Sequence, residues 1–141
     1  MSSDAFVLWV DTPVKVRYAE TDAQRIVYHG AYIPWFEVGR TEYCERAGYP
    51  YPRMEAEGVN IVVVDLRARY RRAARYGDTV TVRTRFAELK SRGCRFAYEV
   101  RLPDGSLAVE AQTDHIFTDG TGRPISIPRA VREAFVSFAG G

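Results

Sequence analysis

The pattern of hydrophobic and polar positions changes period along the chain, and these changes predict the order of elements. Residues 14–18 alternate between apolar and charged side chains, which is typical of a strand. From residue 30 to 47, apolar side chains recur every three or four positions, which predicts an amphipathic helix of roughly four to five turns. Pro34 fits only in the first turn of a helix, so the helix is expected to begin near Ala31. Gly48 provides its end.

Four later segments alternate with period two and predict strands at about 59–74, 79–86, 94–102 and 107–117. In the first of them, one face is apolar and is expected to meet the helix. That face comprises Val62, Val64, Leu66, Ala68 and Tyr70. The segment would extend roughly 45–50 Å, so a bend or a partner subunit is expected. Pro128 then begins a short helix.

The order of elements is a strand, one long helix, and then four antiparallel strands. A single helix cannot cover both faces of such a sheet, so the sheet must wrap around the helix. We therefore predict an α+β fold, with residues 1–141 forming one domain.

Composition adds limits on class and location. Hydrophobic residues make up 46% and charged residues 27%, an ordinary globular balance, and the net charge is +2. That charge is too small to favour nucleic acid. Cys44 and Cys94 lack the spacing of a redox or metal motif and are expected to be free thiols in a reducing cytoplasm. The N-terminus shows no signal-peptide pattern, and no apolar run is long enough to enter a membrane.

Several kinds of chemistry have no support in the sequence. No serine lies in a G-x-S-x-G motif, and no phosphate-binding glycine loop is present. The two histidines, His29 and His115, lie far from both cysteines in sequence, so we expect no metal. His115 alternates with core residues and is interpreted as a hydrogen-bonded sheet residue.

Asp22 is the strongest catalytic candidate. It follows the first strand and precedes the long helix, whose first backbone N–H groups favour negative charge. A carboxylate beside such donors has two parts of an acyl-transfer site, namely a nucleophile or base and an oxyanion-stabilising group. The alternative is that Asp22 only forms a turn or caps the helix.

Other candidates surround this pair, each with a structural alternative. Tyr28 and His29 precede the helix, and the His29 N–H is a candidate oxyanion donor, although both side chains could be ordinary surface residues. Lys90 and Arg92 could hold coenzyme A phosphates or form a charged loop tip. The arginine-rich segment 67–75 fits a phosphate patch, or a solvated or oligomer-facing strand. Glu37 and Glu42 on the helix are expected to be solvated or paired with Arg40.

Taken together, these residues resemble the 4-hydroxybenzoyl-CoA thioesterase family, and especially its small bacterial acyl-CoA thioesterases, including the Tol-Pal-associated branch. The resemblance runs from about residue 12 to 135, and its specific part is 17–40. It is carried by Val16-Arg17-Tyr18, Glu20-Thr21-Asp22, Ile26-Val27-Tyr28-His29, Tyr32, Phe36-Glu37, Arg40, Tyr70 to Asp78, Phe96, Tyr98, Asp119-Gly120 and Ile127-Pro128.

The resemblance implies a hotdog fold that dimerises through the long strand and often pairs again into a homotetramer, with sites between subunits. It implies hydrolysis of an acyl-CoA thioester, with coenzyme A as part of the substrate and no cofactor. Asp22 would act as nucleophile or general base, and the helix N–H at or next to His29 would polarise the carbonyl. Tyr28 and Tyr32 would bind substrate, and Lys90 and Arg92 would contact coenzyme A.

Two positions depart from the family pattern. The family usually has glycine three residues after the acid, where this chain has Arg25, and glycine there often adopts a backbone shape that arginine reaches only at a cost. Ala73 replaces a common proline.

Some alternatives stay open. A non-hydrolytic acyl-CoA-binding hotdog protein would share the pocket without needing Asp22. A nucleic-acid module rests on the arginine segment alone. The acyl group, and the choice between coenzyme A and acyl carrier protein, are open.

Overall fold

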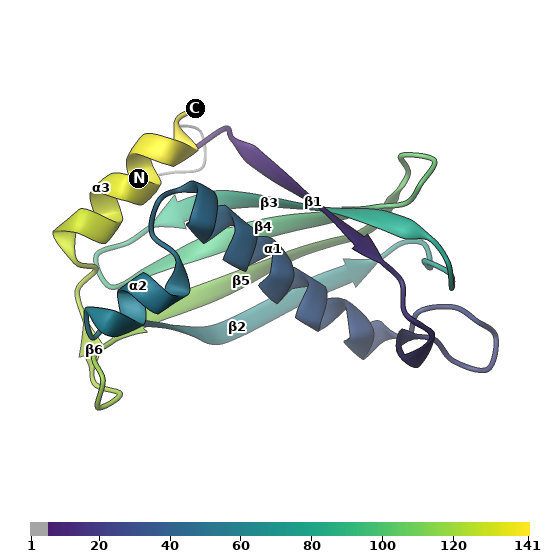
Figure 1. Ribbon diagram of the computed structural model, residues 1–141, viewed down its shortest axis with the longest axis horizontal. Helices are drawn as coiled ribbons and strands as arrows, with labels where there is room; N and C mark the ends of the chain where they lie inside the picture. Colours follow the sequence, from purple (N-terminus) through teal and green to yellow (C-terminus); the bar gives the residue numbers. More distant parts are fainter. Residues whose placement is uncertain (1–5) are drawn as a thin grey trace.

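Helix α1, Tyr32–Arg46, lies across one face of a curved antiparallel sheet in the computed structural model, which describes residues 6–141 (Figure 1). The strand order is β1-β3-β4-β5-β2, with β6 paired to β5. The strands are β1 (Trp9–Lys15), β2 (Asn60–Tyr70), β3 (Thr79–Leu89), β4 (Gly93–Arg101), β5 (Leu107–Thr118) and β6 (Pro124–Ile125). This wrapped-helix α+β arrangement is the predicted hotdog fold. The expectation about an N-terminal targeting segment lies partly outside the described residues.

The start and end of α1 agree with the sequence prediction. A 3-10 turn, η3 (His29–Ala31), leads directly into the helix, and Ala47 is its C-cap. Gly48 follows in the left-handed region, with φ +85°. Gly39 lies where the helix meets β3, because a Cβ there would clash with the Thr84 hydroxyl and approach Val82 to 3.0 Å. The mid-helix glycine therefore permits close packing of helix and sheet.

The expected apolar face of β2 is wrong in its first half. The register of β2 against β5 shifts between Val63 and the residues that follow, so a bulge interrupts the alternation. Val63 pairs with buried His115, and Leu66 pairs with buried Thr113. Val63 and Leu66 therefore both face the helix, whereas strict alternation had placed Val62 there instead. A bulge inserts one extra residue into the strand, so the residues after it change faces. The period-two pattern of the sequence does not reveal this insertion.

Other elements differ modestly from the prediction. The first strand begins at Trp9 rather than near residue 14. A short helix, α2 (Tyr51–Ala56), follows Pro50 and was not predicted. The last helix, α3 (Arg129–Ala139), begins after Pro128 as expected and covers the sheet near the start of β1 (Figure 1).

The cysteines and helices bear on two of the sequence predictions. Cys44 and Cys94 are both free thiols, as predicted, and both are buried. Burial raises the pKa of the Cys44 thiol to about 12, so it stays a neutral core residue. Within residues 6–141, no helix combines the length and the apolar character that crossing a membrane requires.

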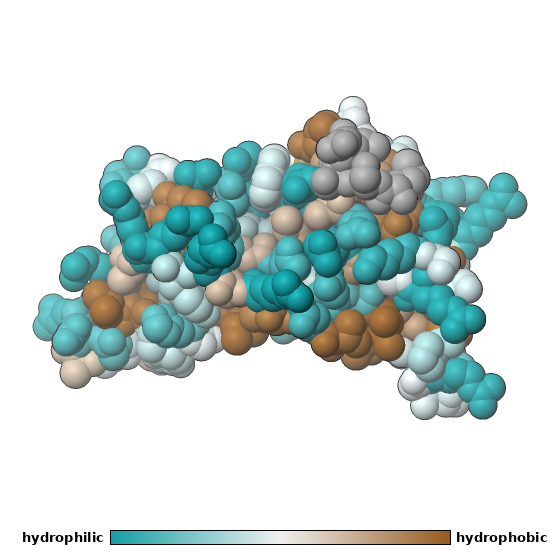
Figure 2. Space-filling view, turned by 180° about the vertical axis from the view of Figure 1, so that it is seen from behind, coloured by the Kyte–Doolittle hydropathy of each residue, from teal (hydrophilic) through white to brown (hydrophobic). Residues whose placement is uncertain are grey.

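One edge of the sheet is apolar and exposed. Strand β2 ends the strand order, and its Val62, Val63 and Val64 are 40%, 43% and 55% exposed. Figure 2 shows hydrophobic residues gathered along the lower margin, where β2 runs in Figure 1. Exposed, apolar edge strands favour pairing with another strand.

Candidate active site

The segment that carries Asp22 is a small hairpin held against the chain before β3. Thr21 pairs with Val27, and Ile26 pairs with Arg75. The Val27 N–H also donates to the Ala74 carbonyl at 2.9 Å. The hairpin therefore has fixed backbone partners on both sides, although it lies outside the main sheet.

Asp22 closes the turn of this hairpin. Its Oδ1 accepts hydrogen bonds from the backbone N–H of Gln24 at 2.8 Å and of Ile26 at 3.4 Å. The turn-forming alternative considered from the sequence is thus correct for one oxygen. Among the residues that the structure describes, Oδ2 has no hydrogen-bond partner, and the side chain is exposed. One carboxylate oxygen is held while the other is accessible.

Arg25 occupies the same turn in a conformation that favours glycine. Its φ is +63°, the sole positive value at a non-glycine position among residues 6–141. The strained backbone anticipated for this departure from the family pattern is therefore present, and its free-energy cost is roughly 1–2 kcal/mol.

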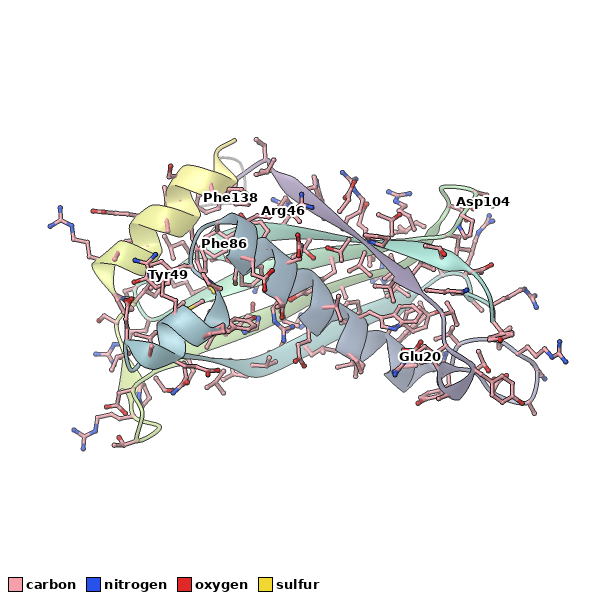
Figure 3. All side chains as sticks on the ribbon, in the orientation of Figure 1. Glu20, Arg46, Tyr49, Phe86, Asp104 and Phe138 are labelled. Atoms are coloured by element: carbon pink, nitrogen blue, oxygen red, sulfur yellow. The ribbon has the colours of Figure 1, made fainter. Side chains whose placement is uncertain are left out.

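Glu20 anchors the hairpin to α1, and sequence reasoning missed it. It is 5% exposed, and its carboxylate accepts from the Trp35 indole at 2.7 Å and from the Arg17 backbone N–H at 2.8 Å. In Figure 3, Glu20 lies beside the start of α1. A usable signal was available, because a buried tryptophan on a helix face needs an acceptor for its N–H.

Burial alone would raise the pKa of Glu20. The hydrogen bonds from the Arg17 backbone, the Trp35 indole and the Arg17 side chain more than offset this, and the net pKa lies below its ordinary value of 4.5. Glu20 is therefore an ionised structural group at neutral pH.

The start of the helix offers backbone donors next to this hairpin. Ala31 donates to the Tyr28 carbonyl, and Tyr32 donates into η3, so both amides are satisfied. The N–H groups of His29 and Gly30 make no hydrogen bond to any residue in 6–141, as is usual for the first residues of a helix. These are the predicted oxyanion donors.

Tyr70, at the end of β2, fixes the position of His29. Its hydroxyl donates to the His29 carbonyl at 3.0 Å, and the two rings stack with centroids 4.5 Å apart. The His29 ring is thus turned toward β2, while its backbone N–H stays open. Tyr32 is buried, and its hydroxyl accepts from the Ala74 N–H at 3.0 Å.

A hollow of about 230 Å³ adjoins this region. It is lined by Ile26, Val27, His29, Tyr32, Tyr70, Arg71, Arg72 and Ala73. Asp22 and Tyr28 are not among its lining residues, and both are exposed. Within one chain, the hollow therefore joins His29 and Tyr32 to two arginines of the predicted phosphate patch, whereas Asp22 stands outside it.

Lys90 and Arg92 lie elsewhere in the chain. Their loop joins β3 to β4, and the Lys90 carbonyl accepts from Arg132 of α3 at 3.0 Å. The Asp22 hairpin adjoins the opposite end of β3, near Arg75 and Asp78. Eleven residues of β3 separate the two ends, which is on the order of 35 Å. A single chain does not bring the basic loop to the candidate acid.

The helix glutamates and His115 also have defined positions. Arg40 is 9% exposed and bonds to tyrosine hydroxyls, so it pairs with neither helix glutamate. Of the two alternatives expected for these glutamates, solvation holds for the exposed Glu37, and Glu42 pairs with Arg46 at 2.9 Å. His115 is buried and hydrogen-bonded to Thr113, as predicted. No cluster of three metal-ligating side chains occurs within residues 6–141.

Comparisons with known proteins identify the family. The model of the thioesterase-like superfamily matches residues 16–135. The chain is 37% identical over 118 residues to the putative acyl-CoA thioesterase YneP of Bacillus subtilis, covering 83% of this chain and 86% of YneP. It is 32% identical over 126 residues to the acyl-CoA thioesterase YbgC of Haemophilus influenzae, covering 87% and 91%.

A solved structure agrees with these relatives. The DHNA-CoA thioesterase of Staphylococcus aureus superposes with a TM-score of 0.87 at 32% identity, covering 92% of this chain and 89% of that one. The chain belongs to the thioesterase-like superfamily, and its fold is the hotdog fold of these enzymes.

Proposed function

We propose that this protein is an acyl-CoA thioesterase that hydrolyses an acyl-CoA thioester to a free acid and coenzyme A. The observations that carry the proposal are an Asp22 carboxylate with one oxygen free of hydrogen bonds within residues 6–141, and open His29 and Gly30 amides at the start of the helix that follows its hairpin. The names of the relatives, YneP and YbgC, support the same reaction. Water is the second substrate.

In this proposal the helix N-terminus stabilises the negative charge that develops on the thioester oxygen. The carboxylate of Asp22 either attacks the carbonyl carbon, forming an acyl-enzyme anhydride, or removes a proton from the attacking water. The fixed Oδ1 orients the group, and the free Oδ2 is the reacting atom. Tyr28 and Tyr32 lie along the path of the substrate near the helix start.

We further propose that the working unit is a homodimer joined through β2, with a dimer-of-dimers tetramer as the larger assembly. The support is the exposed apolar edge of β2. Antiparallel pairing of two β2 strands would set the Asn60 end of one beside the Tyr70 end of the other. The β3–β4 turn lies at the Asn60 end of the sheet, because Gly93 and Val62 both pair with Ile116.

This pairing would direct Lys90 and Arg92 of one subunit toward the Asp22 and His29 region of the other. It accounts for the separation of these residues within one chain, and it would cover the exposed Asp22.

Both cysteines are free thiols, which suits a reducing cytoplasm, where we place the protein.

The reaction is tested by incubating the protein with a panel of acyl-CoA thioesters and measuring release of the free coenzyme A thiol. Turnover of at least one thioester well above the uncatalysed rate supports the proposal. Binding of the same thioesters without thiol release would instead identify an acyl-CoA-binding protein. Single-turnover hydrolysis in oxygen-18 water bears on the route, because label in Asp22 would favour nucleophilic attack, whereas the general-base route places the solvent oxygen in the product acid.

A further inference from the structure

Arg40 is a buried cation without a carboxylate partner. It lies on α1, is 9% exposed, and donates to the Tyr98 hydroxyl at 3.1 Å and to the Tyr51 hydroxyl at 3.4 Å. Among residues 6–141, no carboxylate pairs with it. A guanidinium keeps its proton, and a buried charge without a counter-ion is costly. The site is therefore electrostatically incomplete.

A chain of hydrogen bonds runs from Arg40 through Tyr98 and Thr113 to His115. Arginine only donates, so the Tyr98 oxygen accepts from it at 3.1 Å. The arrangement that leaves the fewest polar groups unpaired has the Tyr98 O–H donating to the Thr113 hydroxyl at 2.7 Å, and Thr113 donating to Nε2 of His115 at 2.7 Å. In this arrangement the neutral ring carries its proton on Nδ1.

The Nδ1 atom of His115 is buried and has no hydrogen-bond partner within the described chain. Burial, together with the charge of Arg40, lowers the pKa of His115 to about 3, so the ring is neutral at physiological pH. One end of the chain of hydrogen bonds is therefore a buried Nδ1 without a partner, and the other end is a guanidinium whose Nη2 makes no hydrogen bond within the described chain. Buried polar atoms such as this Nδ1 are rarely left unsatisfied.

Both residues line a cavity of about 260 Å³ between α1, α2, β2 and β5. Its apolar lining comes from Met54, Val59 and Ile61, and Tyr51 adds a hydroxyl. Glu37 and Glu55 also line it, but both are exposed, so water screens their charges at the rim. The interior offers hydrogen-bond donors and one positive charge. The glutamates at the rim disfavour a ligand that carries a second negative charge.

We propose that this cavity binds a small monocarboxylate, whose oxygens accept from Arg40 and from the Tyr51 hydroxyl while its hydrocarbon part contacts Met54, Val59 and Ile61. A carboxylate matches the planar N–H groups of a guanidinium and supplies the missing counter-ion. This binding site stands independently of thioester hydrolysis. The carboxylate is either a free acid or the far end of an acyl group on a larger thioester.

Binding is tested with benzoate and its neutral isostere benzamide on the purified full chain, by calorimetry and by thermal unfolding. We expect benzoate to bind and to raise the unfolding temperature, and benzamide to do neither. Arg40→Met should abolish the difference, and Tyr51→Phe should weaken benzoate binding roughly tenfold. Tyr49→Phe is the matched control, because that hydroxyl bonds to Glu57 and does not line the cavity.

Wild-type protein gives a second readout if Arg40→Met does not fold. In ¹⁵N-histidine spectra, His115 should be protonated on Nδ1, and its signals should shift when benzoate is added. Comparing hexanoyl-CoA with adipyl-CoA identifies the source, since an Arg40-dependent preference for adipyl-CoA indicates an acyl end, and binding of free benzoate alone indicates a free acid. Equal behaviour of benzoate and benzamide, with no preference for adipyl-CoA, would overturn the proposal.

Discussion

The indole N–H of Trp35 donates to a carboxylate oxygen of Glu20 at 2.7 Å, across fifteen residues of sequence. This bond ties the hairpin that carries Asp22 to the long helix whose start supplies the candidate oxyanion donors. The position of Asp22 relative to the helix therefore depends on Glu20, which takes no part in the proposed chemistry.

Glu20→Gln should make the protein less stable at neutral pH and less sensitive to acid. The folded-state pKa of Glu20 is lowered, so its contribution is complete above its ordinary pKa of 4.5 and is lost as pH falls through the lower folded value. We expect a loss of about 1–2 kcal/mol at pH 7, since a buried charged acceptor is replaced by a neutral one. Denaturant unfolding between pH 7 and pH 3 measures this. The prediction would be contradicted if the free energy of unfolding fell equally with pH in the wild type and in Glu20→Gln.

Arg25→Gly should stabilise the hairpin. The left-handed backbone at Arg25 is strained for any residue with a Cβ and not for glycine. Part of the gain is offset by the greater freedom of glycine in the unfolded chain, so we expect up to about 1 kcal/mol. Arg25→Ala is the control, because it removes the charge and keeps the Cβ. An equal gain in both variants would show that charge, not backbone strain, is responsible.

Gly39→Ala should destabilise the fold by about 1–3 kcal/mol, because the added methyl group would meet the Thr84 hydroxyl and force the helix and sheet apart. Thermal unfolding measures the loss. The double variant Gly39→Ala with Thr84→Ala should recover part of it, since the nearest clashing atom is gone. No recovery in the double variant would place the strain elsewhere on the helix.

Val64→Lys should convert the proposed dimer into monomers, because it introduces a charge at the centre of the exposed edge of β2. Sedimentation velocity at several concentrations measures the change. Val38→Lys is the matched control, as Val38 is also a surface valine, 44% exposed, on helix α1. An unchanged dimer in Val64→Lys, or the same dissociation in Val38→Lys, would argue against pairing through β2.

The elements with strong periodicity could be predicted from the sequence, and those set by single local events could not. Helix α1 was placed closely because Pro34 and Gly48 constrain its ends chemically. The β2 bulge was missed because alternation assigns faces only until a residue is inserted, and α2 was missed because a six-residue helix hardly differs from a turn.

The candidate site was predicted in part, for similar reasons. The turn around Asp22 follows from local backbone chemistry, which a sequence records, and the strain at Arg25 was expected from the glycine that the resembling family has at this position. The burial of Glu20, the isolation of Arg40 from helix glutamates, and the distance of Lys90 from Asp22 depend on contacts between residues far apart in the chain. Spacing along one element carries no information about such contacts.

The central claim is that Asp22 performs the chemistry, and Asp22→Asn tests it most directly. Asparagine keeps the Oδ1 acceptor for the Gln24 and Ile26 amides, so the turn should persist and the unfolding temperature should hardly change. Asp104→Asn is the matched control, since Asp104 closes an exposed turn in the same way, accepting from the Ser106 N–H at 2.9 Å.

The measurement is kcat for thiol release from the best acyl-CoA substrate, made on wild type and both variants. We predict that Asp22→Asn lowers kcat by about 10²- to 10⁴-fold, and that Asp104→Asn leaves it unchanged. Wild-type kcat in Asp22→Asn would contradict the account.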